Sequence, residues 1–183
     1  MKKFFCLLAV MAFFSCKNNE PEVKIAPSQT AHEPIAQTGD LNETSSKVDV
    51  TFEDSTFTET YNAYLDLKAS LVNTDASKAK IAATTMLTKV SEKYKTENLI
   101  EALTKMSGSE DVKEQRIAFE NVSKIMEVLV SGNKITSGAI YKQYCPMAFN
   151  GKGAYWLSNS NEVRNPYFGD QMLKCGLVDK EIK

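Results

Sequence analysis

Apolar residues recur at helical spacing through the middle of the chain. Each apolar stripe begins close to a residue that can cap a helix, and Thr56 and Glu59 fit a capping box before the first stripe. The pattern predicts four helices: about 57–73, from Asp75 or Ser77 to near Tyr94, from Thr96 to about Met106, and about 110–130. Four amphipathic helices joined by short loops are typical of an antiparallel, up-down bundle.

The pattern changes after Gly132, which is suited to end the fourth helix. Two short segments rich in β-forming residues flank the turn at 150–153, which predicts a β-hairpin at about 139–157. Further on, Asp170 is expected to cap a single helical turn that ends before Gly176. The predicted fold class is therefore mainly α, an antiparallel four-helix bundle with a small C-terminal β-hairpin and loop subregion.

The N-terminal end has a different character, with two lysines followed by an apolar run at 4–14. This run is shorter than the roughly 20 residues that span a bilayer, and it is typical of a secretory signal peptide. Cys16 stands where a bacterial lipoprotein carries its lipidated cysteine; the alternative is an ordinary secreted protein cleaved elsewhere. We expect a lipid-anchored protein of the cell envelope, facing the periplasm or the exterior. Its predicted parts are a lipoprotein signal peptide at 1–15, a flexible tether at 16–52 and a helical bundle domain with a C-terminal Cys/Met motif region at 53–183.

Charge and histidine content narrow the classes of function. The formal net charge is −1, so no strong positive field attracts the chain to nucleic acid. The single histidine, His32, lies in the predicted tether, which excludes Ser-His-Asp, Cys-His and histidine-metal chemistry from the predicted domain. The sequence contains neither a P-loop nor a G-x-G-x-x-G motif. An enzyme is therefore not expected.

Two cysteines of the predicted domain, Cys145 and Cys175, each stand close to a methionine, Met147 and Met172. Thiolates and thioethers are soft ligands, and a set of four sulfurs without imidazole favours Cu(I) over Zn²⁺, Mg²⁺ or Ca²⁺. The first pair shares a face if its segment is extended, and the second pair does so if its segment is helical. The other interpretation is a Cys145–Cys175 disulfide, because two cysteines in an oxidising compartment usually pair. Spacing alone leaves both open, and the two can be redox states of one site.

Several motifs resemble a known bacterial family. The N-terminal part of the predicted domain contributes a run of aromatic and aliphatic positions, Tyr61, Tyr64, Leu65, Leu67, Lys68, Leu71 and Val72, followed by Arg116 and Phe119. The more specific part is C-terminal and comprises Tyr144-Cys145-Pro146-Met147-Ala148, Trp156-Leu157-Ser158 and Asn165-Pro166-Tyr167-Phe168-Gly169, with Met172, Cys175 and Gly176. This pattern is similar to the domain of unknown function 3347 family, over about residues 53–180.

The resemblance implies an extracytoplasmic link to heavy metals, most plausibly copper. Members of that family occur alone as lipoproteins or appended to periplasmic adaptor subunits of heavy-metal efflux pumps, so efflux components are the implied partners besides the membrane. The adaptor domains are missing from this chain, and a direct role in export does not carry over. We expect a Cu(I) site with Cys145, Met147, Met172 and Cys175 as ligands, walled from water by Tyr144, Trp156 and Tyr167. The alternative is a protein-interaction module that binds no metal and is stapled by the disulfide.

Overall fold

The computed structural model describes residues 39–183, so the predicted signal peptide, Cys16 and most of the predicted tether lie outside the described residues. Four long helices follow one another along the chain, as predicted. The second ends earlier than expected, because the chain turns at 91–95 and buries Tyr94 against the core. The helices are α1 (Ser55–Val72), α2 (Ala76–Lys89), α3 (Glu97–Gly108) and α4 (Val112–Ser131).

Side-chain caps account for the positions where the helices begin. The predicted capping box of Thr56 and Glu59 is wrong, because the Asp54 carboxylate accepts hydrogen bonds from the backbone N–H groups of Thr56 (2.9 Å) and Phe57 (3.3 Å). An acceptor at this position satisfies N–H groups that have no partner inside the helix. The expected caps of α2 and α3 are confirmed as Asp75 and Thr96.

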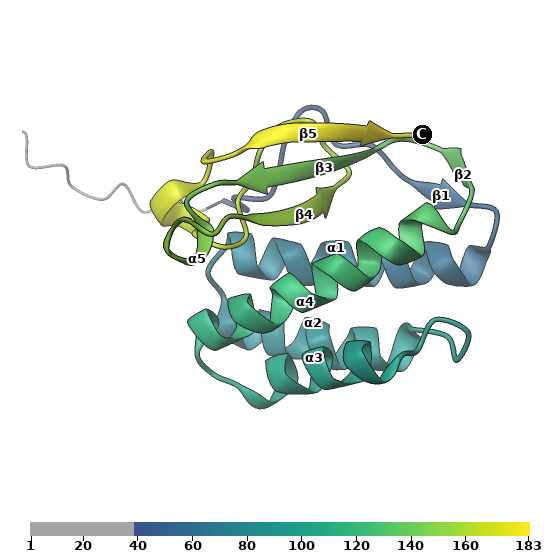
Figure 1. Ribbon diagram of the computed structural model, residues 1–183, viewed down its shortest axis with the longest axis horizontal. Coiled ribbons are helices and arrows are strands. Elements are labelled where there is room, and N and C mark those ends of the chain that lie inside the picture. Colours follow the sequence, from purple (N-terminus) through teal and green to yellow (C-terminus); the bar gives the residue numbers. More distant parts are fainter. Residues whose placement is uncertain (1–38) are drawn as a thin grey trace, which may run out of the picture. The chain divides into compact units, whose positions relative to one another are not determined.

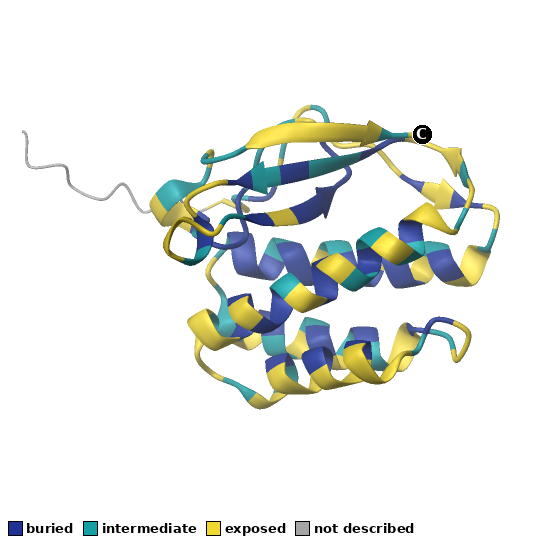
Figure 2. Cartoon of the chain, in the orientation of Figure 1, coloured by how far each residue is buried: buried dark blue, intermediate teal, exposed yellow. Residues whose placement is uncertain are grey.

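The helices pack in the order of the sequence, α1 on α2, α2 on α3 and α3 on α4. In Figure 1, α1 and α4 lie next to the strands, and α2 and α3 lie farther from them. Figure 2 shows buried positions concentrated on the inner faces of both helix layers. Aromatic rings join α1, α4 and the C-terminal segment: Phe119 of α4 stacks on Tyr64 of α1 at 5.5 Å and meets Tyr167 at 5.8 Å.

Two small antiparallel sheets complete the described fold. One pairs β1 (Thr51–Phe52) with β2 (Ile135–Ser137). The other has the strand order β4-β3-β5, and its bounds are β3 (Ile140–Cys145), β4 (Ala154–Ser158) and β5 (Leu177–Ile182). Pairing of β3 with β4 confirms the predicted hairpin, in which a short helical turn, α5 (Ala148–Gly151), connects the strands.

The strand β5 and the ribbon of β1 with β2 were not predicted. Every residue of β5 except Ile182 is exposed, so no alternation of buried and exposed positions marks this edge strand. The expected capping role of Asp170 is wrong as well. Asp170 lies inside the 3₁₀ helix η1 (Gly169–Met172), whose N-cap is Phe168, and η1 ends before Cys175.

The mainly helical class is confirmed, whereas an antiparallel four-helix bundle is not. Two sheets are present, and β4 packs on α4, so the helices bury part of their apolar surface against strands rather than only against one another. In the described part of the chain, no helix combines the length and apolar character needed to cross a membrane.

The segment just before β1 makes specific contacts with the rest of the described chain. The Val48 amide donates to the Asn159 carbonyl oxygen at 2.9 Å, and the Leu41 amide donates to Asn73 Oδ1 at 2.9 Å. Val50 is 3% exposed. Hydrogen bonds and the buried side chain of Val50 therefore join residues 41–50 to the rest of the described chain.

Candidate functional site

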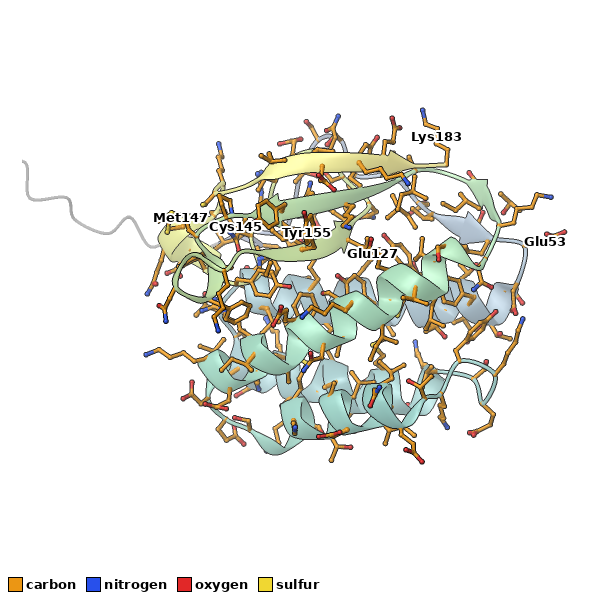
Figure 3. The ribbon with its side chains drawn as sticks, in the orientation of Figure 1. Glu53, Glu127, Cys145, Met147, Tyr155 and Lys183 are labelled. Carbon is orange, nitrogen blue, oxygen red and sulfur yellow. The ribbon has the colours of Figure 1, made fainter. Side chains whose placement is uncertain are left out.

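The two cysteines of the predicted site come together at one end of the larger sheet. Cys145 is the last residue of β3, and Cys175 precedes β5 by two residues. Antiparallel pairing places Tyr144 opposite Leu177, which brings the two cysteines side by side. Their Sγ atoms lie 3.3 Å apart, without a bond between them. Figure 3 labels Cys145 at this end of the sheet.

Backbone interactions position Cys175. Its amide donates to the Met172 carbonyl oxygen at 3.0 Å, and its own carbonyl oxygen accepts from Asn165 Nδ2 at 2.7 Å. Gly176 follows with φ +143°, and a Cβ there would lie 2.8 Å from the Tyr144 carbonyl oxygen and 3.0 Å from Trp156. Only glycine fits this approach of β5 to β3. Sequence reasoning missed the positioning role of Asn165, although its place before Pro166 indicates a turn.

The surroundings of Cys175 favour the protonated form of its thiol. Cys145 is fully buried, and Cys175 is half-buried. Burial raises the pKa of the Cys175 thiol, and the neighbouring Cys145 raises it further. A cation that binds both sulfurs as thiolates must therefore displace protons, which makes its apparent affinity increase with pH.

The two methionines are not brought together as the two thiols are. The segment from Cys145 to Met147 is not extended, so the condition for the two sulfurs to share a strand face is not met: β3 ends at Cys145, and Met147 has helical angles, φ −82° and ψ −14°. Met147 is 54% exposed and lines a surface groove. Met172 ends η1 and is joined to Cys175 by the turn hydrogen bond given above. The structure thus brings the two thiols together, with Met172 one turn from Cys175 and Met147 at the surface.

Of the three predicted wall residues, Trp156 lies beside the site and Tyr167 packs on Trp156. Trp156 is fully buried next to Gly176, and its ring meets that of Tyr167 edge-on at 5.9 Å. Tyr144 points to the opposite face of β3 from Cys145, because successive strand residues alternate. Its ring packs on Tyr155 at 4.5 Å and does not line the thiol pair.

Gln143 is a further polar residue near this end of the sheet, and sequence reasoning missed it. It is fully buried on the same face of β3 as Cys145, and its Nε2 donates to the Ser160 carbonyl oxygen at 2.9 Å. Its Oε1 has no hydrogen-bond partner among the described residues. An alternating buried position in a predicted strand was the only sequence signal for it.

Within residues 39–183, no group of three or more His, Cys, Asp or Glu side chains could hold a metal ion. A metal at the thiol pair would therefore have two thiolates as its charged protein ligands. This donor set suits a soft monovalent cation and is too small for the four-ligand sites typical of structural zinc.

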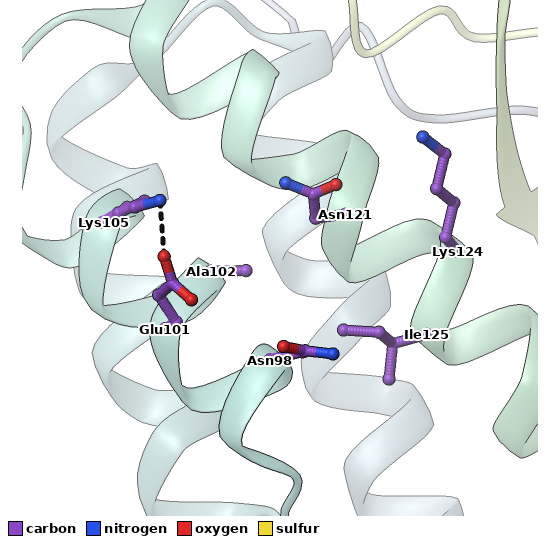
Figure 4. A pocket seen from close by; sticks show the side chains of 7 residues that line it. All are labelled: Asn98, Glu101, Ala102, Lys105, Asn121, Lys124 and Ile125. Atoms are coloured by element: carbon purple, nitrogen blue, oxygen red, sulfur yellow. Dashed lines mark ion pairs between the residues drawn. The ribbon is translucent and has the colours of Figure 1, made fainter.

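A separate cavity of about 390 Å³ lies between α3 and α4 (Figure 4). Lys105 and Glu101 form an ion pair of 2.7 Å at its edge. Lys124, also on its wall, pairs with Glu120. Each of these lysines is paired with a carboxylate, and Ile125 is the main apolar residue of the lining. The cavity therefore presents neither an excess of one charge nor a large apolar surface to a ligand.

These features define a mainly helical domain covered by a small antiparallel sheet, with a thiol pair where β3 and β5 meet. Residues 60–138 match the family described as "Protein of unknown function (DUF3347)", which confirms the resemblance to this family. The match extends from within α1 to just beyond β2, so it ends before Cys145. No curated protein and no solved structure matches the chain.

A buried lysine forms a second titratable feature, between α1 and β4. Lys68 is 2% exposed, and its Nζ donates to Ser158 Oγ at 3.3 Å. Burial first, and then the positive charges of Lys47 and Arg164, lower the pKa of Lys68 to about 7, with Asp40 opposing the shift. No ion pair involves Lys68 among the described residues, so its ammonium form is destabilised.

We expect the free energy of unfolding to rise with pH between about 7 and 10.5 because of Lys68. In this window the unfolded chain keeps the proton that the folded chain has lost, and the slope contributed is at most about 1.4 kcal/mol per pH unit. Below pH 7 both states are protonated, and the contribution is constant. Urea denaturation of the parent and of Lys68→Met at several pH values measures it. The same slope in both proteins would contradict the assignment.

Proposed function

We propose that this protein is a lipoprotein of the cell envelope that binds a soft heavy-metal ion, Cu(I), in metal handling or resistance. The observation that carries the proposal is the approach of Cys145 Sγ to Cys175 Sγ, at 3.3 Å. Two thiolates at this distance can chelate one cation after a small adjustment, and soft sulfur ligands select Cu(I).

Chelation follows from the properties of the pair. Each thiol gives up its proton on binding, and the two thiolates supply a charge of −2 to a monovalent cation. Met172, one turn from Cys175, offers a thioether, and Met147 can add a second one through rotation of its exposed side chain. Trp156, buried beside Gly176, excludes water from one side and presents an aromatic ring to a cation.

The proposal includes the parts of the chain outside the described residues. A signal peptide at 1–15 and lipidated Cys16 would hold the domain at a membrane, facing the periplasm or the exterior. Heavy-metal efflux components are the proposed partners, as the family resemblance implies. The four helices would act as the rigid support of the site, in the antiparallel order that the sequence predicts.

A second candidate function is an interaction module that binds no metal and is stapled by a Cys145–Cys175 disulfide. The short sulfur separation is compatible with a disulfide as well as with a metal. Two sulfurs on one tetrahedral metal, each bonded at about 2.3 Å, lie roughly 3.8 Å apart. A disulfide bond is about 2.05 Å long. The observed 3.3 Å lies between these values, so forming either the disulfide or the metal site requires a small movement of the sulfurs.

The experiment that separates the two functions is a Cu(I) titration of the fully reduced protein against a competing chelator. We expect one Cu(I) per chain, and loss of at least about 100-fold in affinity in Cys145→Ser/Cys175→Ser, since two charged ligands are removed. Met147→Leu and Met172→Leu should lose less, and Met86→Leu, in the core of α2, should lose nothing. Unchanged copper affinity in the double serine variant would reject the metal function in favour of the interaction module.

A further inference from the structure

A groove of about 350 Å³ opens on the surface between the start of α4 and the turn that follows β3. Its apolar lining includes Ile117 of α4, which is 50% exposed, together with Met147, Phe149 and Phe168. The same helix contributes two cationic lining residues one helical turn apart, Lys113 and Arg116. No acidic side chain of the described residues lines this groove.

Arg116 is a buried cation without a carboxylate partner. It is 8% exposed, its Nε donates to the Pro166 carbonyl oxygen at 2.8 Å, and its Nη2 donates to the Leu71 carbonyl oxygen and to Thr74 Oγ1. Nη1 has no hydrogen bond to any described residue. The Asp170 carboxylate acts on the guanidinium through space but forms no ion pair with it in the described chain.

The backbone beside the groove is strained. Phe149 and Asn150 both have left-handed backbone angles, with φ of 51° and 59°. Consecutive residues other than glycine rarely take this conformation, and such strain concentrates at ligand-binding sites. Here it turns the chain sharply after β3 and places Phe149 on the wall of the groove.

We propose that this groove binds a monocarboxylate with an apolar body, such as a medium-chain fatty acid, with the carboxylate on Arg116 and Lys113. The Nη1 group of Arg116 and the ammonium group of Lys113 both donate to the carboxylate, and the aliphatic chain lies against Ile117, Met147 and Phe168. The volume is in the range of small-molecule sites, which are largely apolar and carry few polar groups. This site needs neither Cys145 nor Cys175, although Met147, which could reach the copper site, also lines the groove.

Calorimetric titration of the full chain with sodium octanoate tests the proposal. We expect saturable binding of one octanoate, and binding of octanol, which has the same chain without the charge, weaker by at least about 10-fold, because the charge-assisted contacts with Arg116 and Lys113 are lost. Ile117→Glu places a negative charge in the groove and should abolish octanoate binding. Ile81→Glu is the matched control, since Ile81 is 65% exposed on α2 outside the groove, and it should bind as the parent does.

Lys113→Gln separates charge recognition from shape without disturbing the buried Arg116, because Lys113 is exposed. It should weaken octanoate binding several-fold and leave octanol binding unchanged. Equal binding of octanoate and octanol, unchanged octanoate binding by Ile117→Glu, or no binding of octanoate by the parent would each overturn the proposal.

Discussion

Replacement of Phe119 by alanine is expected to lower the free energy of unfolding by about 3–5 kcal/mol. Phe119 is fully buried in α4 and contacts an aromatic ring on each side, Tyr64 of α1 and Tyr167 of the loop before η1. Its removal leaves a cavity between the helices and the segment that leads to Cys175. Surrounding rings are too rigid to fill it, so both the transfer free energy and the packing contacts are lost.

Val128→Ala on the same helix is the matched control, because Val128 is 69% exposed. It should change the free energy of unfolding by less than about 0.5 kcal/mol. Urea denaturation followed by circular dichroism measures both variants. A loss below 1 kcal/mol in Phe119→Ala would show that the helices and the C-terminal segment do not share one core.

Oxidation of the thiol pair is expected to raise the free energy of unfolding by about 3–4 kcal/mol. A Cys145–Cys175 bond would close a loop of roughly 30 residues and restrict the unfolded chain, as described by the chain-entropy treatment of disulfides. The two Sγ atoms already lie 3.3 Å apart, so closing the bond requires little displacement of β5 from β3. Oxidation should also abolish Cu(I) binding, because the bond consumes both thiolates.

Cys175→Ser is the control for this effect and should show the same stability before and after treatment with an oxidant. Denaturation curves of oxidised and reduced protein, with free thiols counted in each sample, give the comparison. Equal stability of the two forms would mean that the pair does not close, or that strain in the folded state cancels the gain.

The helices could be predicted because their signals are local. Asp75 and Thr96 cap α2 and α3 as expected from the residue types alone, and apolar positions such as Leu99 and Met126 recur at helical spacing. The cap of α1 was misplaced because Asp54 and Thr56 are both suitable acceptors two residues apart. Which of two such residues caps the helix depends on the backbone conformation, and here Asp54 has the extended conformation of an N-cap.

Elements that depend on distant partners could not be predicted. The residues of strand β5 are exposed and several are charged, so its sequence does not indicate a strand. Its pairing with β3 depends on the segment before it, where Asn165 holds Cys175 by a hydrogen bond. The contacts of residues 40–50 likewise include hydrogen bonds to residues far along the chain, such as Asn159 and Glu162. Such contacts leave no periodic pattern in the sequence from which they could be predicted.

The sequence identified the residues of the candidate site better than their geometry. Cys145 and Cys175 were chosen because each is a soft sulfur ligand close to a methionine, and the structure places their sulfur atoms in contact. The expectation for Met147 depended on an extended segment, but Pro146 follows the end of β3 and the chain turns there. Tyr144 was grouped with the site because it adjoins Cys145 in sequence, although strand alternation directs the two side chains apart.

X-ray absorption spectroscopy of the reduced, copper-loaded protein tests the central claim most directly, because it identifies the atoms bound to the metal. A site made by Cys145 and Cys175 predicts monovalent copper with only sulfur in its first shell, and loss of the sulfur signal in Cys145→Ser/Cys175→Ser. A first shell of nitrogen or oxygen atoms, or the same sulfur shell in the double variant, would contradict it.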